Sequence, residues 1–135
     1  MSIRHVNPEG LLKFDQLTQV VVTDASRMAF IAGQSAMNER FELVGGDDCF
    51  AQSVQALRNL RTAVEAAGSS VDRLLSSTVY LKNLTPAVGE QFMRALAVAL
   101  DGVPFPPHAF SMVGVQSLAS PDILVEISAI AAVDA

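Results

Sequence analysis

The feature that most constrains this chain is an apolar segment near the C-terminus, residues 123–131, which holds one ionisable side chain, Glu126. Its β-branched and aliphatic residues predict a largely buried strand. Residues 109–115 form a similar segment, in which Val113 and Val115 flank a glycine, and a short connection joins the two predicted strands. An unpaired carboxylate is costly inside an apolar strand, so Glu126 must face water, a hydrogen bond or a ligand. We therefore expect the functional site to include Glu126.

Four further β-rich segments are expected to be strands, at residues 4–7, 19–23, 28–32 and 74–81. The polar turn at 24–27 predicts that the second and third of these form a hairpin. This pairing rests on the short spacing between the two segments.

Two helices are expected between the strands. The first begins near Asp47 or Asp48, carries apolar residues at spacings of three and four, and ends at Gly68. The second begins at Pro86, with Thr85 as its N-cap. The order of strands, helix, strand, helix and two strands predicts an α+β fold, with a mainly antiparallel sheet and two segregated helices.

At 135 residues the chain is expected to be a single domain, residues 1–135. Half of its residues are hydrophobic and 17% are charged, below the roughly 25% of an average soluble protein. A small monomer of this composition would expose much apolar surface. We therefore expect an oligomer whose subunits bury part of that surface.

The net charge of −5 argues against a nucleic-acid partner, because phosphate binding needs a basic surface. No apolar run approaches the ~18 residues of a membrane span, and the first ten residues lack the apolar region of a signal peptide. The single cysteine, Cys49, cannot form an internal disulfide, which favours a cytoplasmic location. His5 and His108 lie far apart and make a weak metal site, so no metal and no cofactor are expected.

Two stretches resemble the Rid family, the reactive intermediate deaminases, a family also named endoribonuclease L-PSP. Residues 125–131 read Val-Glu-Ile-Ser-Ala-Ile-Ala and residues 32–34 read Ala-Gly-Gln, close to the family's Val-Glu-Ile-x-Ala-Ile-Ala and Ser-Gly-Gln. The resemblance covers nearly the whole chain. It implies a chorismate-mutase-like fold of the RidA/YjgF type with two helices on one face of the sheet, a homotrimer, and small-molecule clefts between the subunits.

The resemblance also implies site residues. In the family, the glutamate at the position of Glu126 is thought to activate a water molecule that attacks an imine carbon, a general-base role that suits a carboxylate. The alternative is that Glu126 only forms hydrogen bonds that fix the trimer. Leu17 and Ala32 stand where the family has Tyr and Ser. The substrate-binding positions implied by the pattern are Leu17, Ala32, Gly33, Gln91, His108, Ala109 and Phe110.

The carboxylate-binding arginine of the family's Pro-Ala-Arg motif is absent from this sequence. Phe110 takes its place when the strand sets the alignment, and Ala109 or His108 when the prolines do. His108 could offer a partial positive charge, or be a loop histidine in an ordinary hydrogen bond. No Lys or Arg follows Arg94, although another subunit could supply one. Small 2-imino acids such as 2-iminopropanoate are therefore expected to be poor substrates.

Two functions remain open from the sequence. One is a hydrolase that deaminates a reactive enamine, imine or similar small metabolite, with Glu126 as the base. The other is a non-catalytic small-molecule-binding module of the same fold. A ribonuclease activity, which has been attached to relatives of this family, is disfavoured by the acidic charge and the lack of a paired acid and base.

Overall fold

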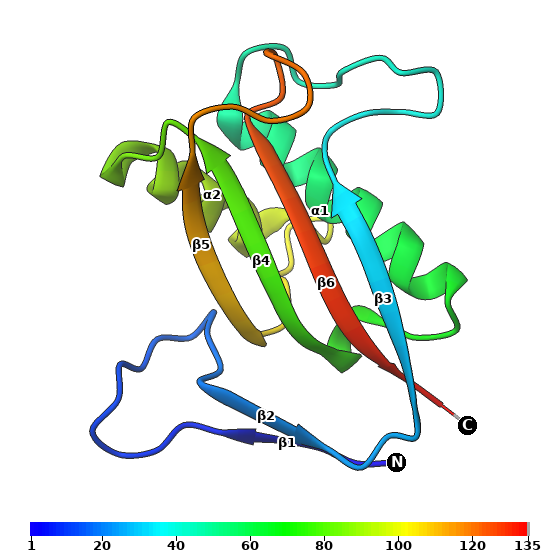
Figure 1. Ribbon diagram of the computed structural model, residues 1–135. Helices are drawn as coiled ribbons and strands as arrows, with labels where there is room; N and C mark the ends of the chain where they lie inside the picture. The colour runs from blue at the N-terminus through cyan, green and yellow to red at the C-terminus, as the bar shows by residue number, and fades with distance from the viewer. Residues whose placement is uncertain (135) are drawn as a thin grey trace.

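The structure is a computed structural model that describes residues 1–134. Its main feature is a four-stranded sheet in the order β3-β6-β4-β5 (Figure 1). The strands are β3 (Arg27–Gln34), β6 (Val125–Val133), β4 (Leu74–Lys82) and β5 (Ala109–Val115). β6 pairs antiparallel with β3 and β4, whereas β4 and β5 are parallel. The apolar C-terminal segment therefore supplies a central strand.

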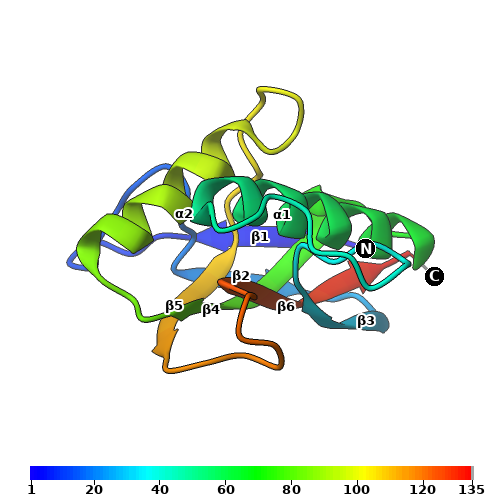
Figure 2. The same cartoon turned by 90° about the horizontal axis from the view of Figure 1, so that it is seen from above.

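Two helices, α1 (Cys49–Ala66) and α2 (Pro86–Val98), cover one face of this sheet (Figure 2). A short 3-10 helix, η1 (Val71–Arg73), leads into β4. The side chains of β4 and β6 that face the helices are fully buried at Val79, Leu81, Val125 and Ile127. This arrangement confirms the predicted α+β fold. No helix among the described residues covers the opposite face of the sheet, so the alternate side chains project from an open surface.

Local sequence signals set the helix boundaries as predicted. Asp48 and Thr85 are the N-caps of α1 and α2, and each accepts a hydrogen bond from a backbone N–H in the first turn. Gly68 follows α1 with a φ of 84°, the left-handed conformation that commonly closes a helix, and its N–H donates to the carbonyl of Glu65. Among residues 1–134, no helix is both long and apolar enough to span a membrane.

The predicted hairpin between residues 19–23 and 28–32 is wrong. β2 (Val20–Thr23) pairs antiparallel with β1 (Ile3–Val6) in a separate two-stranded sheet. β3 joins the large sheet instead, where Phe30 lies opposite Ile130 of β6. The short spacing indicated a turn, but the choice of partner depends on the apolar strand that β6 offers from the far end of the chain.

The two C-terminal strands, β5 and β6, do not pair with each other. Both flank β4, so the connection at 116–124 passes from one side of β4 to the other. The parallel pair of β4 and β5 is joined through α2, as parallel neighbours require a crossover. Two of the three pairings in the large sheet are antiparallel, and the third makes the sheet mixed.

Candidate functional site

Glu126 lies on the face of the sheet that the helices leave open. Its neighbours in β6, Val125 and Ile127, are fully buried against the helices. Because side chains alternate along a strand, Glu126 projects from the opposite face, where it is half-buried. The ion pairs and side-chain hydrogen bonds found among residues 1–134 do not include its carboxylate. The carboxylate is therefore placed to meet water or a ligand.

Gly33 of β3 lies directly beside this carboxylate. A Cβ atom at residue 33 would overlap Oε2 of Glu126 and lie 2.7 Å from Cδ, closer than real Cβ atoms approach. The register between β3 and β6 is irregular between Ile31 and Gln34, at the place where Gly33 meets β6. The absence of a side chain at Gly33 therefore gives Glu126 its room.

A buried glutamine on α1, Gln52, fixes the chain that leads into β6. Its Nε2 donates to the carbonyls of Gly46 at 2.6 Å and Asp122 at 3.0 Å. Its Oε1 accepts a hydrogen bond from the N–H of Leu124 at 2.9 Å. The side chain is fully buried, so these three bonds satisfy its amide within the protein. Leu124 is two residues before Glu126, and Gln52 thereby fixes the approach to the site.

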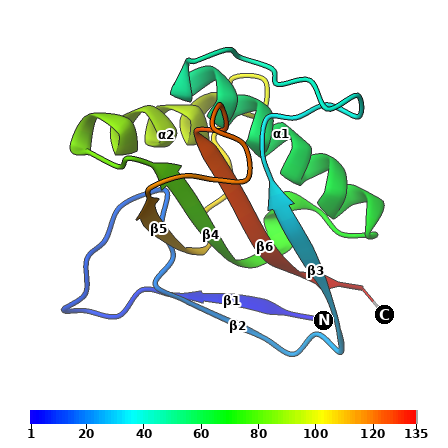
Figure 3. The same ribbon diagram turned by 45° about the horizontal axis from the view of Figure 1, so that its top comes forward.

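Asn59, two turns further along α1, holds the chain that leaves β3. Its Nδ2 donates to the carbonyls of Ser35 at 2.8 Å and Met37 at 3.0 Å. Ser35 is two residues after Gly33, so one helix holds both segments that carry the Gly33–Glu126 contact. Figure 3 shows the connections that follow β3 and precede β6 at the same end of the sheet.

Phe110 and His108 lie on the helix side of the sheet, away from Glu126. Phe110 is the partner of Ser77 on β4 and packs against the core. His108 is 2% exposed, and its Nδ1 donates to the carbonyl of Pro106 at 3.1 Å, while Nε2 accepts from Oγ of Ser77 at 2.7 Å. Burial lowers the pKa of His108, which keeps the ring neutral. The partial positive charge considered for this residue therefore does not reach a surface site.

The Ser77–His108 pair contains the atoms of a nucleophile and its base, with the Pro106 carbonyl orienting the ring. Ser77 is only 6% exposed, and His108 less. A substrate cannot reach either group in this structure. We therefore assign the pair a structural role, joining the start of β5 to β4.

The remaining predicted residues lie near Glu126, near His108, or on α2. Ala32 precedes Gly33 on β3 and is exposed. Leu17 forms an isolated parallel bridge with His108, and Ala109 begins β5. Gln91 lies half-buried on α2. Within a single chain, Ala32 and Gly33 therefore lie near Glu126. A second region, around the start of β5, contains Leu17, His108, Ala109 and Phe110.

Several cations of residues 1–134 are engaged with other groups. Arg58 pairs with a carboxylate at 3.7 Å and Arg94 lies over an aromatic ring at 4.7 Å, and both are on the helices, across the sheet from Glu126. Arg27 donates to a carbonyl near the C-terminus. Lys82 donates at 2.7 Å to a carbonyl of the connection before β6. Lys82 follows the fully buried Leu81 on β4 and so projects from the same open face as Glu126, but the ion pairs found among residues 1–134 do not join the two.

A hollow of about 240 Å³ lies on the open face of the sheet. Its lining includes Thr78 of β4 and Ser128 of β6, which are partners in adjacent strands. Ser128 is the next residue on the same face of β6 as Glu126. The hollow therefore adjoins the carboxylate along the strand direction.

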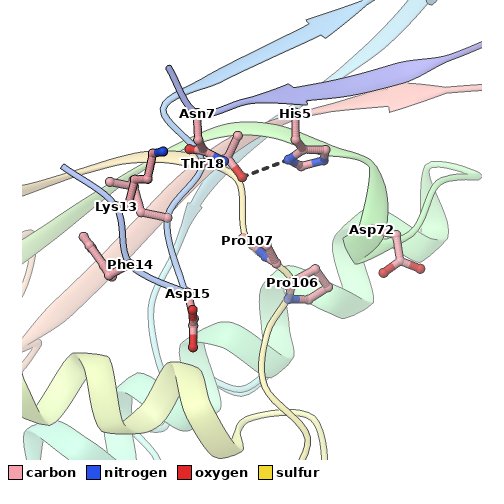
Figure 4. Close-up of a pocket in the computed structure, with 10 residues that line it drawn as sticks. His5, Asn7, Lys13, Phe14, Asp15, Thr18, Asp72, Pro106 and Pro107 are labelled. Carbon is pink, nitrogen blue, oxygen red and sulfur yellow. Dashed lines mark hydrogen bonds between the residues drawn. The ribbon is translucent and has the colours of Figure 1, made fainter. Parts of the chain in front are cut away.

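A larger hollow, about 460 Å³, lies between the loop that joins β1 to β2 and the prolines Pro106 and Pro107 before β5 (Figure 4). Leu17 and Lys13 line it, and Nδ1 of His5 and Oγ1 of Thr18 share a hydrogen bond of 2.8 Å at its edge. Neither Glu126 nor a residue next to it takes part. We place the candidate site at Glu126, because Gln52 and Asn59 fix the segments on either side of its contact with Gly33, while Lys13 is exposed. Among residues 1–134, no cluster of His, Cys, Asp and Glu is arranged to hold a metal ion.

The family model named endoribonuclease L-PSP matches residues 12–133. The chain belongs to this family. Its structure is similar to that of YyfB from Yersinia pestis, described as a Rid-family protein of unknown function. The two are 34% identical, with a TM-score of 0.89 and coverage of 98% of this chain and 100% of that chain. No curated protein matches the chain.

Two more solved structures extend the comparison of this L-PSP family chain. Rv2704 from Mycobacterium tuberculosis, a member of the YjgF/YER057c/UK114 family, is 27% identical, with a TM-score of 0.57 and coverage of 98% and 100% of the two chains. NMB1025 from Neisseria meningitidis, of the YjgF family, is 19% identical, with a TM-score of 0.63 and coverage of 100% and 98%. At 19% identity, the similarity to NMB1025 shows a shared fold and nothing more.

Three residues near the site of this L-PSP family chain escaped the sequence analysis. Tyr80 of β4 is the strand partner of Glu126 and is the only tyrosine in the sequence. Its position as the only tyrosine, between two apolar residues of a predicted strand, was the available signal. Gln52 and Asn59 are amides seven residues apart on the first helix, and such a pair beside an apolar stripe was a signal of buried hydrogen bonds.

Proposed function

We propose that this L-PSP family protein is a homotrimer that binds and hydrolyses a small, neutral imine or enamine in clefts between its subunits. Glu126 is the general base in this proposal. The observation that carries it is the carboxylate of Glu126, which lies on an open sheet face, held against Gly33 and without a protein partner among residues 1–134. A positioned general base contributes roughly 10²–10⁴-fold to a rate.

The open face of the sheet supports the assembly. Phe30 is 74% exposed there, and Met28 and Val113 are also exposed. Exposed apolar side chains gathered on one face of a weakly charged chain favour burial against another subunit. A second copy on this face would turn the surface around Glu126 into a cleft.

The separation of the predicted site residues supports the same arrangement. Phe110 is paired with Ser77, whose partner on β6 is Ala129, three residues from Glu126. This places Phe110 about 10 Å along the strands and on the other face. We assign Leu17, Ala109 and Phe110 to the wall that a neighbouring subunit contributes, since a single chain keeps them away from Glu126.

The charges around Glu126 favour a neutral ligand. A carboxylate on the substrate would face Glu126, a group of like charge, while Lys82 on the same face is bonded to the carbonyl of Pro121. A charge-assisted contact of the kind that an arginine gives contributes roughly 1.5–3 kcal/mol. Its loss corresponds to about tenfold to 150-fold in kcat/KM.

The test compares ammonia release from two imines, each relative to its uncatalysed rate. Acetophenone imine is neutral, and 2-iminopropanoate, generated from alanine by an amino-acid oxidase, carries a carboxylate. We expect a kcat/KM at least tenfold higher for the neutral imine. Equal values, or a preference for 2-iminopropanoate, would contradict the assignment and indicate a cation from a neighbouring subunit. Saturable binding of acetophenone without turnover of either imine would support the non-catalytic binding module instead.

A further inference from the structure

The second functional group of this site is Tyr80: we propose that its phenol donates the proton that the imine nitrogen needs when water adds. The inference rests on the proposed hydrolysis with Glu126 as base, and it names the acid that such a reaction requires. It also narrows the ligand to a neutral compound with a basic nitrogen.

Strand register places the two side chains together. Tyr80 of β4 and Glu126 of β6 are direct partners in the antiparallel pair. The residues on either side of Tyr80, Val79 and Leu81, are fully buried against the helices, so Tyr80 projects from the open face as Glu126 does. Directly opposite residues have Cβ atoms about 4.5–5.5 Å apart.

Both side chains retain free hydrogen-bonding capacity. Tyr80 and Glu126 are half-buried, and neither appears in the side-chain hydrogen bonds or ion pairs found among residues 1–134. A phenol donates and an ionised carboxylate only accepts. The pair thus offers one donor and one acceptor to the same small molecule.

The row across the sheet defines what that molecule must be. Glu126, Tyr80 and Val113 are partners in register on β6, β4 and β5, and Gly33 of β3 lies against Glu126 on the other side. The two polar groups are central, and a residue without a side chain and an apolar residue flank them. This pattern fits one electrophilic carbon with one nitrogen, carried between apolar substituents. The hollow lined by Thr78 and Ser128 adjoins the row and has room for such a substituent.

The proposed reaction balances with these two groups alone. Glu126 takes a proton from water as the oxygen bonds to the imine carbon, and the electrons of the C=N double bond move to nitrogen, which takes the proton of Tyr80. In the collapse of the carbinolamine, its hydroxyl proton returns to the Tyr80 phenolate and the C=O bond forms. The C–N bond breaks, its electron pair stays on nitrogen, and the nitrogen takes the proton held by Glu126 and leaves as ammonia. Both side chains end in their starting states.

A matched pair of variants tests the role of the phenol. Tyr80→Phe removes the hydroxyl that we assign to catalysis. Thr62→Val removes an exposed hydroxyl from α1, on the helix side of the sheet. With acetophenone imine we expect Tyr80→Phe to lower kcat at least tenfold with KM changed less than threefold, whereas Thr62→Val should change both less than threefold. A structural role for Tyr80 would not separate kcat from KM in this way.

The outcomes distinguish this inference from the function on which it rests. Wild-type kcat in Tyr80→Phe, with turnover lost in Glu126→Gln, would overturn the role of Tyr80 and leave the function standing. Wild-type turnover in Glu126→Gln would overturn both.

A second measurement needs no turnover. The chain has one tyrosine, so protein with ring-labelled tyrosine gives NMR signals from Tyr80 alone. These signals should shift saturably as acetophenone, the product ketone, is added. An absence of any shift up to the solubility of acetophenone would contradict contact between Tyr80 and the ligand.

Discussion

The carboxylate of Glu126 and the backbone of Gly33 lie so close that a methyl group on residue 33 would overlap Oε2. Two strands that are far apart in the sequence, β3 and β6, meet at this contact. The side chains of Gln52 and Asn59 on α1 fix the segments that adjoin it. The position of the carboxylate therefore depends on an absent side chain as much as on present ones.

Gly33→Ala should displace the carboxylate and lower activity without unfolding the protein. The overlapping atoms are at the end of a flexible side chain that can rotate away, so we expect less than about 1 kcal/mol of lost stability, below the usual range for an overpacked core. Hydrolysis of acetophenone imine should fall at least tenfold. In the double variant Gly33→Ala with Glu126→Asp, the shorter acid relieves the overlap, and activity should partly return. Full activity in Gly33→Ala alone would show that the contact does not position the base.

Gln52→Leu should destabilise the protein strongly for the size of the change. The substitution leaves the carbonyls of Gly46 and Asp122 and the N–H of Leu124 without their partner. Each buried group left unsatisfied costs about 1–3 kcal/mol, and water can reach some of them, so we expect a loss of about 2–5 kcal/mol in the free energy of unfolding. Chemical denaturation measures this value. Gln55→Leu on the same helix removes one partly exposed hydrogen bond and should cost less than about 1 kcal/mol. Equal losses of stability in the two variants would contradict the role given to the three hydrogen bonds of Gln52.

Buried His108 predicts that stability falls in mild acid. Burial holds the pKa of His108 below the ordinary histidine value of 6.5, so below that pH the unfolded chain binds a proton that the folded chain does not. The free energy of unfolding therefore decreases as pH falls from 6.5 toward the folded pKa, by at most about 1.4 kcal/mol per pH unit for one group. Denaturation between pH 7 and 5.5, at fixed protein concentration, should show this slope in wild type and in His5→Gln. An undiminished slope in His108→Gln would assign the effect to other groups.

The open face of the sheet predicts a trimer that dissociates when a charged side chain is introduced on that face. The wild type should scatter light as about 43 kDa, three times 14.3 kDa. Phe30→Asp places a carboxylate on this face and should yield a monomer at micromolar concentration, because burying an unpaired charge is costly. Phe41 is more exposed, 88% against 74%, but lies in the loop before α1, so Phe41→Asp should leave the trimer intact. A monomeric wild type, or a trimeric Phe30→Asp variant, would contradict the assembly.

The parts of this fold that local chemistry decides could be predicted from the sequence. The caps at Asp48 and Thr85 and the glycine after α1 act within one helical turn, and each lies where it was expected. The partner of β3 could not be predicted, because it is a strand about a hundred residues further on, and a close spacing suggested a nearer one. Tyr80 escaped notice for the same reason, since only the register between β4 and β6 places it opposite Glu126.

The candidate site shows a similar division. The family pattern selected Glu126 and Gly33, and these two are in contact. The same pattern gathered Phe110 and His108 with them, but a sequence pattern does not record which face of a sheet a side chain takes. A shift of one residue along a strand reverses that face, and Phe110 faces the helices.

The most direct test of the account is the rate of ammonia release from acetophenone imine by wild type, Glu126→Gln and Glu90→Gln, the last an exposed glutamate on α2. Light scattering first establishes that the three proteins share one oligomeric state. The account predicts catalysis by wild type and Glu90→Gln at equal rates, and a loss of about a hundredfold or more in Glu126→Gln, in line with the removal of a positioned general base. A rate for Glu126→Gln equal to that of wild type, or a wild-type rate no faster than the uncatalysed reaction, would contradict it.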